Sequence, residues 1–202
     1  MIQNSSLSGK TNKVNDYKRY LRDYITNTIQ PNVFITIQPA FERKTTDAQQ
    51  FTEEIKFILR LTEKNLLGKR WSKHHYPFVV CLENDHGKST WHAHILGKFT
   101  NPFTGQPEPQ GDIEQALEKA NHSYRCKYGC KQDINTKVCM LDNATSVRKA
   151  TSYCTKETWC QFLYDSEPVR SEKSSALFGL GINTSQSLDA EIKQKLLAGT
   201  NA

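Results

Sequence analysis

Short apolar runs bounded by turn-forming residues mark four strand candidates along the chain. Residues 32–39 (NVFITIQP) are rich in β-branched and aromatic side chains. Residues 76–84 (YPFVVCLEN), 90–99 (TWHAHILGKF) and 134–142 (INTKVCMLD) have the same character. Runs of this composition and length are typical of β-strands. Only a short polar turn separates the second run from the third, so we expect these two to pair as an antiparallel hairpin.

Apolar residues at helical spacing predict helices between and around these strands. The clearest pattern starts near a capping Thr46 or Asp47 and ends at Gly68. Its apolar stripe consists of Phe51, Ile55, Ile58, Leu59 and Leu66. The same spacing predicts helices over residues 17–29, 113–124, 144–164 and 188–197, and the Pro- and Gly-rich residues 100–112 are predicted to form a loop.

The predicted elements follow the order helix, strand, helix, strand, strand, helix, strand, helix. A hairpin combined with helices of this length favours an α+β fold, in which helices pack on a central antiparallel sheet. A chain of 202 residues suits one domain with additional segments. We therefore divide it into an N-terminal lead and helix (1–31), a main domain (32–165) and a polar C-terminal extension (166–202).

The charge balance points to a polyanionic partner. The chain has 27 Lys and Arg against 21 Asp and Glu, a formal net charge of +6, which favours nucleic acid first and an acidic membrane surface second. No apolar run approaches the roughly 18 residues of a membrane helix, and the polar N-terminus lacks the apolar core of a secretory signal. We interpret the six cysteines as reduced thiols. These features predict a cytoplasmic protein without a membrane partner.

Two histidines alternate with apolar residues in the second strand of the predicted hairpin. His92 and His94 are two positions apart, so both side chains project from one face of a strand. The hairpin would bring Glu83 beside them. Two imidazoles and one carboxylate suit Mn²⁺, Mg²⁺ or a similar ion, with positions left for water and substrate. Asp85 and His86, in the turn, are rival third ligands.

A tyrosine and a lysine share one face of the predicted helix 144–164, for which Thr145 is a candidate cap. Lys149, Tyr153 and Lys156 follow one another at spacings of four and three residues. A nearby cation stabilises a phenolate or a phosphate. Tyrosine forms covalent intermediates when it is activated, and a metal that polarises the electrophile is one way to assist it.

Together these constellations resemble the motifs of the HUH endonucleases, the nicking domains of rolling-circle replication initiators and relaxases. The segment 34–39 (FITIQP) loosely matches the family's first motif, although its polar end departs from the usual pattern. His92, Ala93 and His94, with the upstream Glu83, match the second motif. Tyr153 and Lys156 match the third, Tyr-x-x-Lys, and YCTKE is particularly similar to its form in the initiators of circular single-stranded DNA viruses and related plasmids. The resemblance spans roughly residues 32–163.

The resemblance implies a fold, a reaction and partners. The fold is an HUH/RRM-like central antiparallel sheet of about five strands with flanking helices. A divalent metal, Mn or Mg, is held by Glu83, His92 and His94. Tyr153 attacks the scissile phosphate of single-stranded DNA or an origin hairpin, leaving a 5′-phosphotyrosine link and a free 3′-hydroxyl, and Lys156 assists. Such a DNA endonuclease and strand transferase initiates rolling-circle replication of a plasmid, phage or virus together with a host helicase and polymerase.

Basic and aromatic residues that would hold the DNA strand occur in two groups. They combine phosphate contact with base stacking, the usual means of binding single strands. The residues are Lys69, Arg70, Trp71 and Lys73, together with Arg148 and Lys149.

Three alternatives remain open at this stage. One is a non-catalytic, zinc-stabilised nucleic-acid-binding module, because His122, Cys126, Cys130 and Cys139 approach the spacings of zinc ligands. Another is a single-tyrosine transposase of the same fold. A third is a metal-binding structural protein without nuclease activity.

Overall fold

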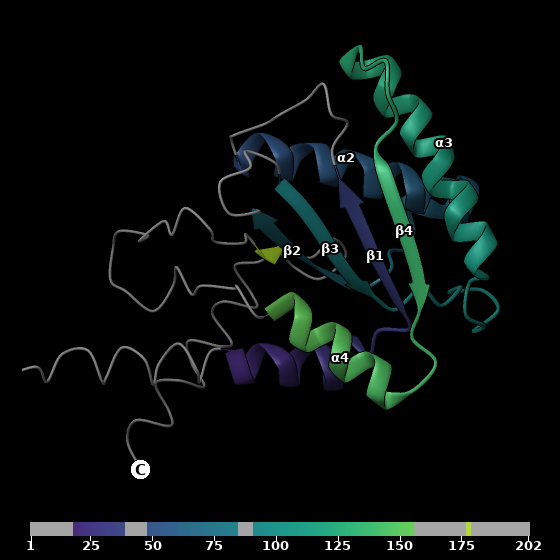
Figure 1. Cartoon of the computed structure of the whole chain (residues 1–202). Coiled ribbons are helices and arrows are strands. Elements are labelled where there is room, and N and C mark those ends of the chain that lie inside the picture. Colours follow the sequence, from purple (N-terminus) through teal and green to yellow (C-terminus); the bar gives the residue numbers. More distant parts are fainter. Residues whose placement is uncertain (1–17, 39–47, 85–90, 156–176, 179–202) are drawn as a thin grey trace, which may run out of the picture.

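An antiparallel sheet lies at the centre of the fold, with helices on both of its faces (Figure 1). The computed structural model describes residues 18–38, 48–84, 91–155 and 177–178. A helix over residues 18–29 comes first, and its last turn is the π-helix η1 (Ile25–Ile29). The remaining elements are β1 (Val33–Gln38), α2 (Ala48–Leu67), the 3-10 helix η2 (Gly68–Lys73), β2 (Phe78–Asn84), β3 (Trp91–Gly97), α3 (Gln110–Tyr128), β4 (Asn135–Met140), α4 (Ala144–Thr155) and β5 (Leu177–Phe178).

The strand order in the sheet is β4-β1-β3-β2-β5, and every neighbouring pair is antiparallel. The central run β1-α2-β2-β3-α3-β4 is the βαββαβ arrangement of ferredoxin-like folds. The predicted α+β class and the β2–β3 hairpin pairing are therefore confirmed. Four strands have six or seven residues, whereas β5 is a two-residue segment beside β2. The predicted count of about five strands stays a prediction.

Each face of the sheet buries its own cluster of side chains, because successive strand residues point to opposite faces. On one face, α2 and α3 cover the larger core, which includes Ile35, Val80 and Ile95. On the other face, helix 18–29 and α4 cover a smaller cluster that contains Val79, Cys81 and Leu96. No helix in the described part of the chain is long and apolar enough to cross a membrane.

The observed helix boundaries differ from the predicted ones for physical reasons. α3 begins at Gln110, inside the stretch expected to be a loop, because Pro109 adopts an extended conformation directly before it and Asp112 in the first turn favours the helix N-terminus. It continues past the predicted end to Tyr128 and stops at Gly129, whose positive φ of 66° ends the helix. The expected caps Thr46 and Asp47, the end of the helix predicted over 144–164 and the helix predicted over 188–197 lie outside the described residues.

Helix α2 carries two buried carboxylates toward its neighbours. Glu54 accepts a hydrogen bond of 2.6 Å from the Tyr124 hydroxyl on α3. Glu63 accepts one of 2.8 Å from the backbone N–H of Tyr76, and its second oxygen lies 3.1 Å from His75 Nδ1. Burial raises the pKa of Glu63, and the hydrogen bonds from Tyr76 and His75 oppose this only in part.

This raised pKa predicts a pH-dependent stability. A carboxyl whose pKa is higher in the folded state stabilises the fold below its ordinary value of 4.5, and this contribution is lost as the pH rises through the raised pKa. Glu63→Gln keeps an acceptor for the Tyr76 N–H but does not titrate. Urea unfolding at several pH values should show a fall in the unfolding free energy of the wild type above about pH 4.5 that is missing in Glu63→Gln. Parallel pH profiles for the two proteins would contradict this, and Glu53→Gln, exposed on the same helix, is the matched control.

Candidate active site

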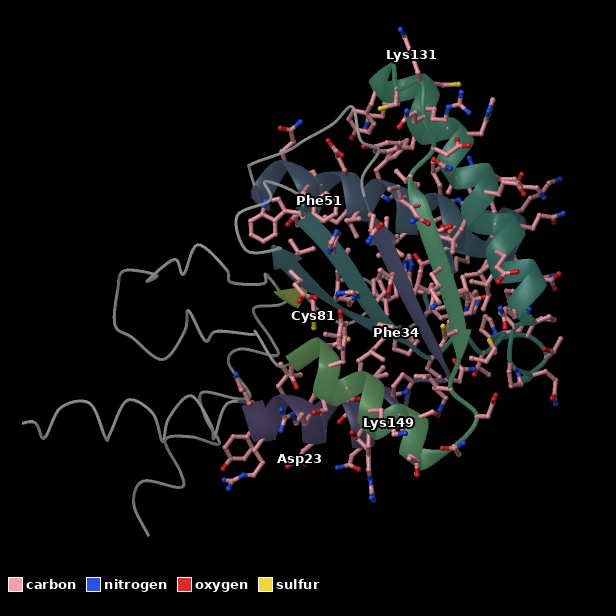
Figure 2. All side chains as sticks on the ribbon, in the orientation of Figure 1. Asp23, Phe34, Phe51, Cys81, Lys131 and Lys149 are labelled. Atoms are coloured by element: carbon pink, nitrogen blue, oxygen red, sulfur yellow. The ribbon has the colours of Figure 1, made fainter. Side chains whose placement is uncertain are left out.

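The sheet face beneath α4 gathers the side chains of the candidate site. Strand register sets their arrangement. His94 of β3 lies between Thr36 of β1 and Cys81 of β2, and Glu83 and His92, each two residues away along its own strand, form the next pair on this face. Figure 2 shows Phe34 and Cys81 between the sheet and α4. The hairpin therefore brings a carboxylate and two imidazoles to one face, on the side of the sheet that α4 covers.

Glu83 and His94 are in direct contact. The Oε2 atom of Glu83 lies 2.8 Å from Nε2 of His94, and the two side chains are only 12% and 6% exposed. A carboxylate oxygen presents lone pairs alone, so this approach is attractive only when Nε2 carries a proton or when a cation lies at the same place. The pair is therefore either a hydrogen bond from Nε2–H to the carboxylate or a place that suits a cation, and it is largely shielded from water.

Thr36 holds the opposite side of the same imidazole. Its hydroxyl oxygen lies 3.2 Å from Nδ1 of His94. A hydroxyl both donates and accepts, so Thr36 donates to Nδ1 when Nε2–H faces Glu83, and it accepts from Nδ1–H when Nε2 offers its lone pair to a cation. The ring also stacks on Phe34, with centroids 5.7 Å apart and planes at 19°. These contacts fix the orientation of His94 while both tautomers keep a partner.

Tyr153 reaches this cluster from α4. Its ring meets the ring of His94 in a T-shaped contact with centroids 5.1 Å apart and planes at 82°, and it meets Phe34 at 6.4 Å. The residue is nevertheless 45% exposed. Cys154 and Thr155, the next two residues on the helix, face the interior, and Tyr153 lies at the edge of this buried side of the helix. Tyr153 therefore stands at the rim of the site, with one side of its ring against His94 and another open to solvent.

Both ends of α4 are anchored, which determines where Tyr153 lies. At the start, Asn143 Oδ1 accepts a 2.9 Å bond from the Ser146 N–H, so Asn143 caps the helix where we expected Thr145 to do so. At the other end, Arg22 Nε donates a 2.8 Å bond to the buried hydroxyl of Thr155. Arg22 belongs to helix 18–29, so this helix supports the turn that carries Tyr153.

His92 occupies the same face but does not complete a metal-binding group. It is partly exposed and lies opposite Glu83 in the ladder, while Glu83 reaches diagonally to His94. Across the described ranges, no three His, Cys, Asp or Glu side chains are grouped as metal ligands. The rival ligands Asp85 and His86 lie outside those ranges, as does Lys156.

The predicted DNA-binding residues fall into two separate places. Arg148 and Lys149 are exposed on α4, on the helix that carries Tyr153. The other group is on η2, before the start of β2, whereas Glu83 is near the far end of that strand, about 17 Å away along it. Trp71 of that group is half-buried against the core, with the Arg60 guanidinium 6.0 Å from its ring centre, and its stacking on DNA stays a prediction.

The zinc alternative gains little from the structure. His122 Nε2 and Cys126 Sγ lie 3.9 Å apart, one turn from each other on the exposed side of α3. Cys130 is buried in the larger core, and no third ligand joins the pair within the residues that the structure describes.

Sequence reasoning missed Thr36 and Arg22 as parts of the site. The alternation of the segment 34–39 puts Thr36 on one face of its strand, but only the β1–β3 pairing makes that the face of His94.

Comparisons with protein-family models, with curated proteins and with solved structures found no match.

Proposed function

We propose that this chain is a metal-dependent, HUH-type endonuclease that nicks single-stranded DNA through a 5′-phosphotyrosine intermediate and so initiates rolling-circle replication. The observation that carries the proposal is the ring contact between Tyr153 and His94, whose imidazole is bonded to Glu83. Three residues that the motif resemblance links, from β2, β3 and α4, thus meet in one cluster.

The chemistry of the donors suits a divalent cation, although His92 is not grouped with Glu83 and His94 in the structure. A carboxylate oxygen and an imidazole nitrogen approach each other where a cation would be stabilised, and His92 lies on the same face. Carboxylate and imidazole donors suit Mn²⁺ well and Mg²⁺ through the carboxylate. Thr36 supplies the oxygen that typically orients a metal-bound histidine through its other nitrogen. Glu83, His94 and His92 would hold the ion, which when bound supplies positive charge to an oxygen of the scissile phosphate.

In the proposed reaction, the Tyr153 oxygen attacks the phosphorus as its proton is lost. The bond between phosphorus and the 3′-oxygen breaks, and that oxygen takes up a proton to become a 3′-hydroxyl. One phosphodiester is exchanged for another, so a later hydroxyl can reverse the step and rejoin strands. The exposed side of Tyr153 gives a strand access to the phenol, and Arg148 and Lys149 on the same helix attract its phosphates. Lys156 would balance the phosphate charge, and host helicase and polymerase would use the 3′-hydroxyl in the cytoplasm.

The direct test is a search for the covalent intermediate. The purified chain is incubated with Mn²⁺ and a labelled library of single-stranded oligonucleotides, and the products are separated in SDS. The proposal expects a labelled protein band that resists SDS, does not form when EDTA is present during the incubation, and yields phosphotyrosine on acid hydrolysis. Cleaved DNA that carries no attached protein would contradict it.

Thr36 provides a second test of the proposed metal site. Thr36→Val keeps the shape of the side chain and removes the hydroxyl that contacts His94 Nδ1. Loss of such an orienting partner weakens metal affinity by about 10- to 100-fold. Titration with Mn²⁺, followed by electron paramagnetic resonance, should show this weakening, and Thr136→Val on β4 should bind Mn²⁺ like the wild type. Equal Mn²⁺ affinity for Thr36→Val and the wild type would exclude this orienting role.

A further inference from the structure

A second exposed aromatic ring lies outside the candidate active site. Phe103 is 43% exposed, and with Tyr153 it forms the set of large apolar side chains exposed in the described part of the chain. It sits in the loop between β3 and α3, while η2 and the residues after it pack alongside. The guanidinium carbon of Arg70 is 4.9 Å from the ring centre of Phe103, and the His74 ring meets it at 4.8 Å and 77°.

The loop is built to hold this ring outward. Asn101 Oδ1 accepts hydrogen bonds from the backbone N–H of Phe103 at 3.0 Å and of Thr104 at 3.3 Å. The N–H of Gly105 bonds to the Asn101 carbonyl at 2.8 Å, and its φ of 71° is one that a side chain would strain. This hydrogen-bonded turn holds Phe103 beside Arg70 and His74 with 43% of its surface exposed.

The surroundings of Phe103 are positively charged. The two segments that meet here, 68–77 and 97–107, contain no Asp or Glu. Their cations are Lys69, Arg70, Lys73 and Lys98. The adjoining carboxylates are Glu63 and Glu108, and both are buried and accept hydrogen bonds from Tyr76. The exposed charges around this ring are therefore positive.

We propose that Phe103, Arg70, Lys69 and Lys73 form a second binding site for single-stranded nucleic acid, separate from the candidate active site. A base stacks on Phe103, and the cations contact the flanking phosphates. Stacking on an exposed ring beside cations is the usual mode of sequence-tolerant single-strand binding. A duplex offers no unstacked base to the ring, and lysines are depleted from the cores of protein–protein interfaces. The site would hold a segment of the strand well away from the scissile phosphate.

The test measures binding alone, so it is independent of whether Tyr153 cuts DNA. Fluorescence anisotropy follows a labelled oligo-dT of about 20 nucleotides binding to the full chain in EDTA at several salt concentrations. Phe103→Ala should raise the Kd by about 5- to 150-fold, the equivalent of losing one stacked base, and leave the salt dependence unchanged. Arg70→Gln should raise the Kd and reduce the slope of log K against log salt by about 0.7, the value for one phosphate contact.

Matched variants separate stacking from general effects. Lys119→Gln, exposed on α3, removes the same charge elsewhere and should leave the salt slope at the wild-type value. Phe103→Trp keeps a flat ring and should bind at least as tightly as the wild type, which tests the site even if Phe103→Ala proves unstable. Wild-type Kd values for both Phe103→Ala and Arg70→Gln would overturn the proposal and leave this patch to a protein partner. Wild-type binding by Phe103→Leu would overturn the stacking contact.

Discussion

Tyr153→Phe is expected to abolish the SDS-resistant protein–DNA adduct and the Mn²⁺-dependent nick with it. Removing a covalent nucleophile lowers turnover by on the order of 10³-fold or more, because binding and electrostatic terms cannot replace the bond it forms. The phenylalanine ring keeps the edge contacts with His94 and Phe34, and the lost oxygen belongs to a residue that is 45% exposed. The fold should therefore be unaffected, and the loss would be chemical.

The adduct assay needs a tyrosine control of the same kind. Tyr128 packs against Phe57 on the opposite side of the sheet, so Tyr128→Phe removes a phenol oxygen far from the site. It should form the adduct at the wild-type rate, and thermal melting should report similar stability for all three proteins. Continued adduct formation by Tyr153→Phe would assign the chemistry to another residue and end the single-tyrosine mechanism.

Glu83→Gln is expected to weaken Mn²⁺ binding and to slow adduct formation by at least about 100-fold. A bound cation contributes several kcal/mol of charge stabilisation in such reactions, and each 1.4 kcal/mol is a factor of ten in rate. Glutamine has nearly the shape of glutamate, and its amide oxygen still accepts from the Nε2–H of His94, so the 2.8 Å contact survives. Only the negative charge that would hold the cation is lost.

Two measurements distinguish a metal ligand from a structural ion pair. If Glu83 is a ligand, the rate of Glu83→Gln should recover partly at high Mn²⁺ concentration. If the Glu83–His94 pair is structural, the variant should instead melt at a lower temperature and keep its Mn²⁺ affinity. Glu53→Gln, exposed on α2, makes the same change of charge and should alter neither property.

The local pattern of the chain predicts most of the fold, whereas long-range pairing decides the site. The hairpin follows from two apolar runs around one turn, and it brings Glu83 to the histidines as expected. That β1 lies beside β3 is not encoded in any short segment, so the contact of Thr36 with His94 was not predicted. The same limit explains why the two groups of basic residues lie apart. One is on η2, beside the larger core, and the other is on α4, which covers the smaller cluster on the other face of the sheet.

Side-chain direction sets a second limit on prediction from sequence. Alternation correctly puts His92 and His94 on one face, but it does not distinguish their environments. His94 is enclosed by Thr36, Phe34 and Tyr153, whereas His92 is partly exposed. Which histidine is buried depends on where α4 crosses the sheet, and this depends on the Asn143 cap and on the length of the β4–α4 connection.

The hydrogen bond from Arg22 to Thr155 couples helix 18–29 to the position of Tyr153, the proposed nucleophile. Leu21, Ile25 and Ile29 are fully buried with Cys154, and burial of each such side chain is worth about 1.5–3 kcal/mol. A chain that begins at residue 32, where the resemblance to the HUH motifs begins, would lack this buried packing. It would also lack the hydrogen bond from Arg22 to the last turn of α4.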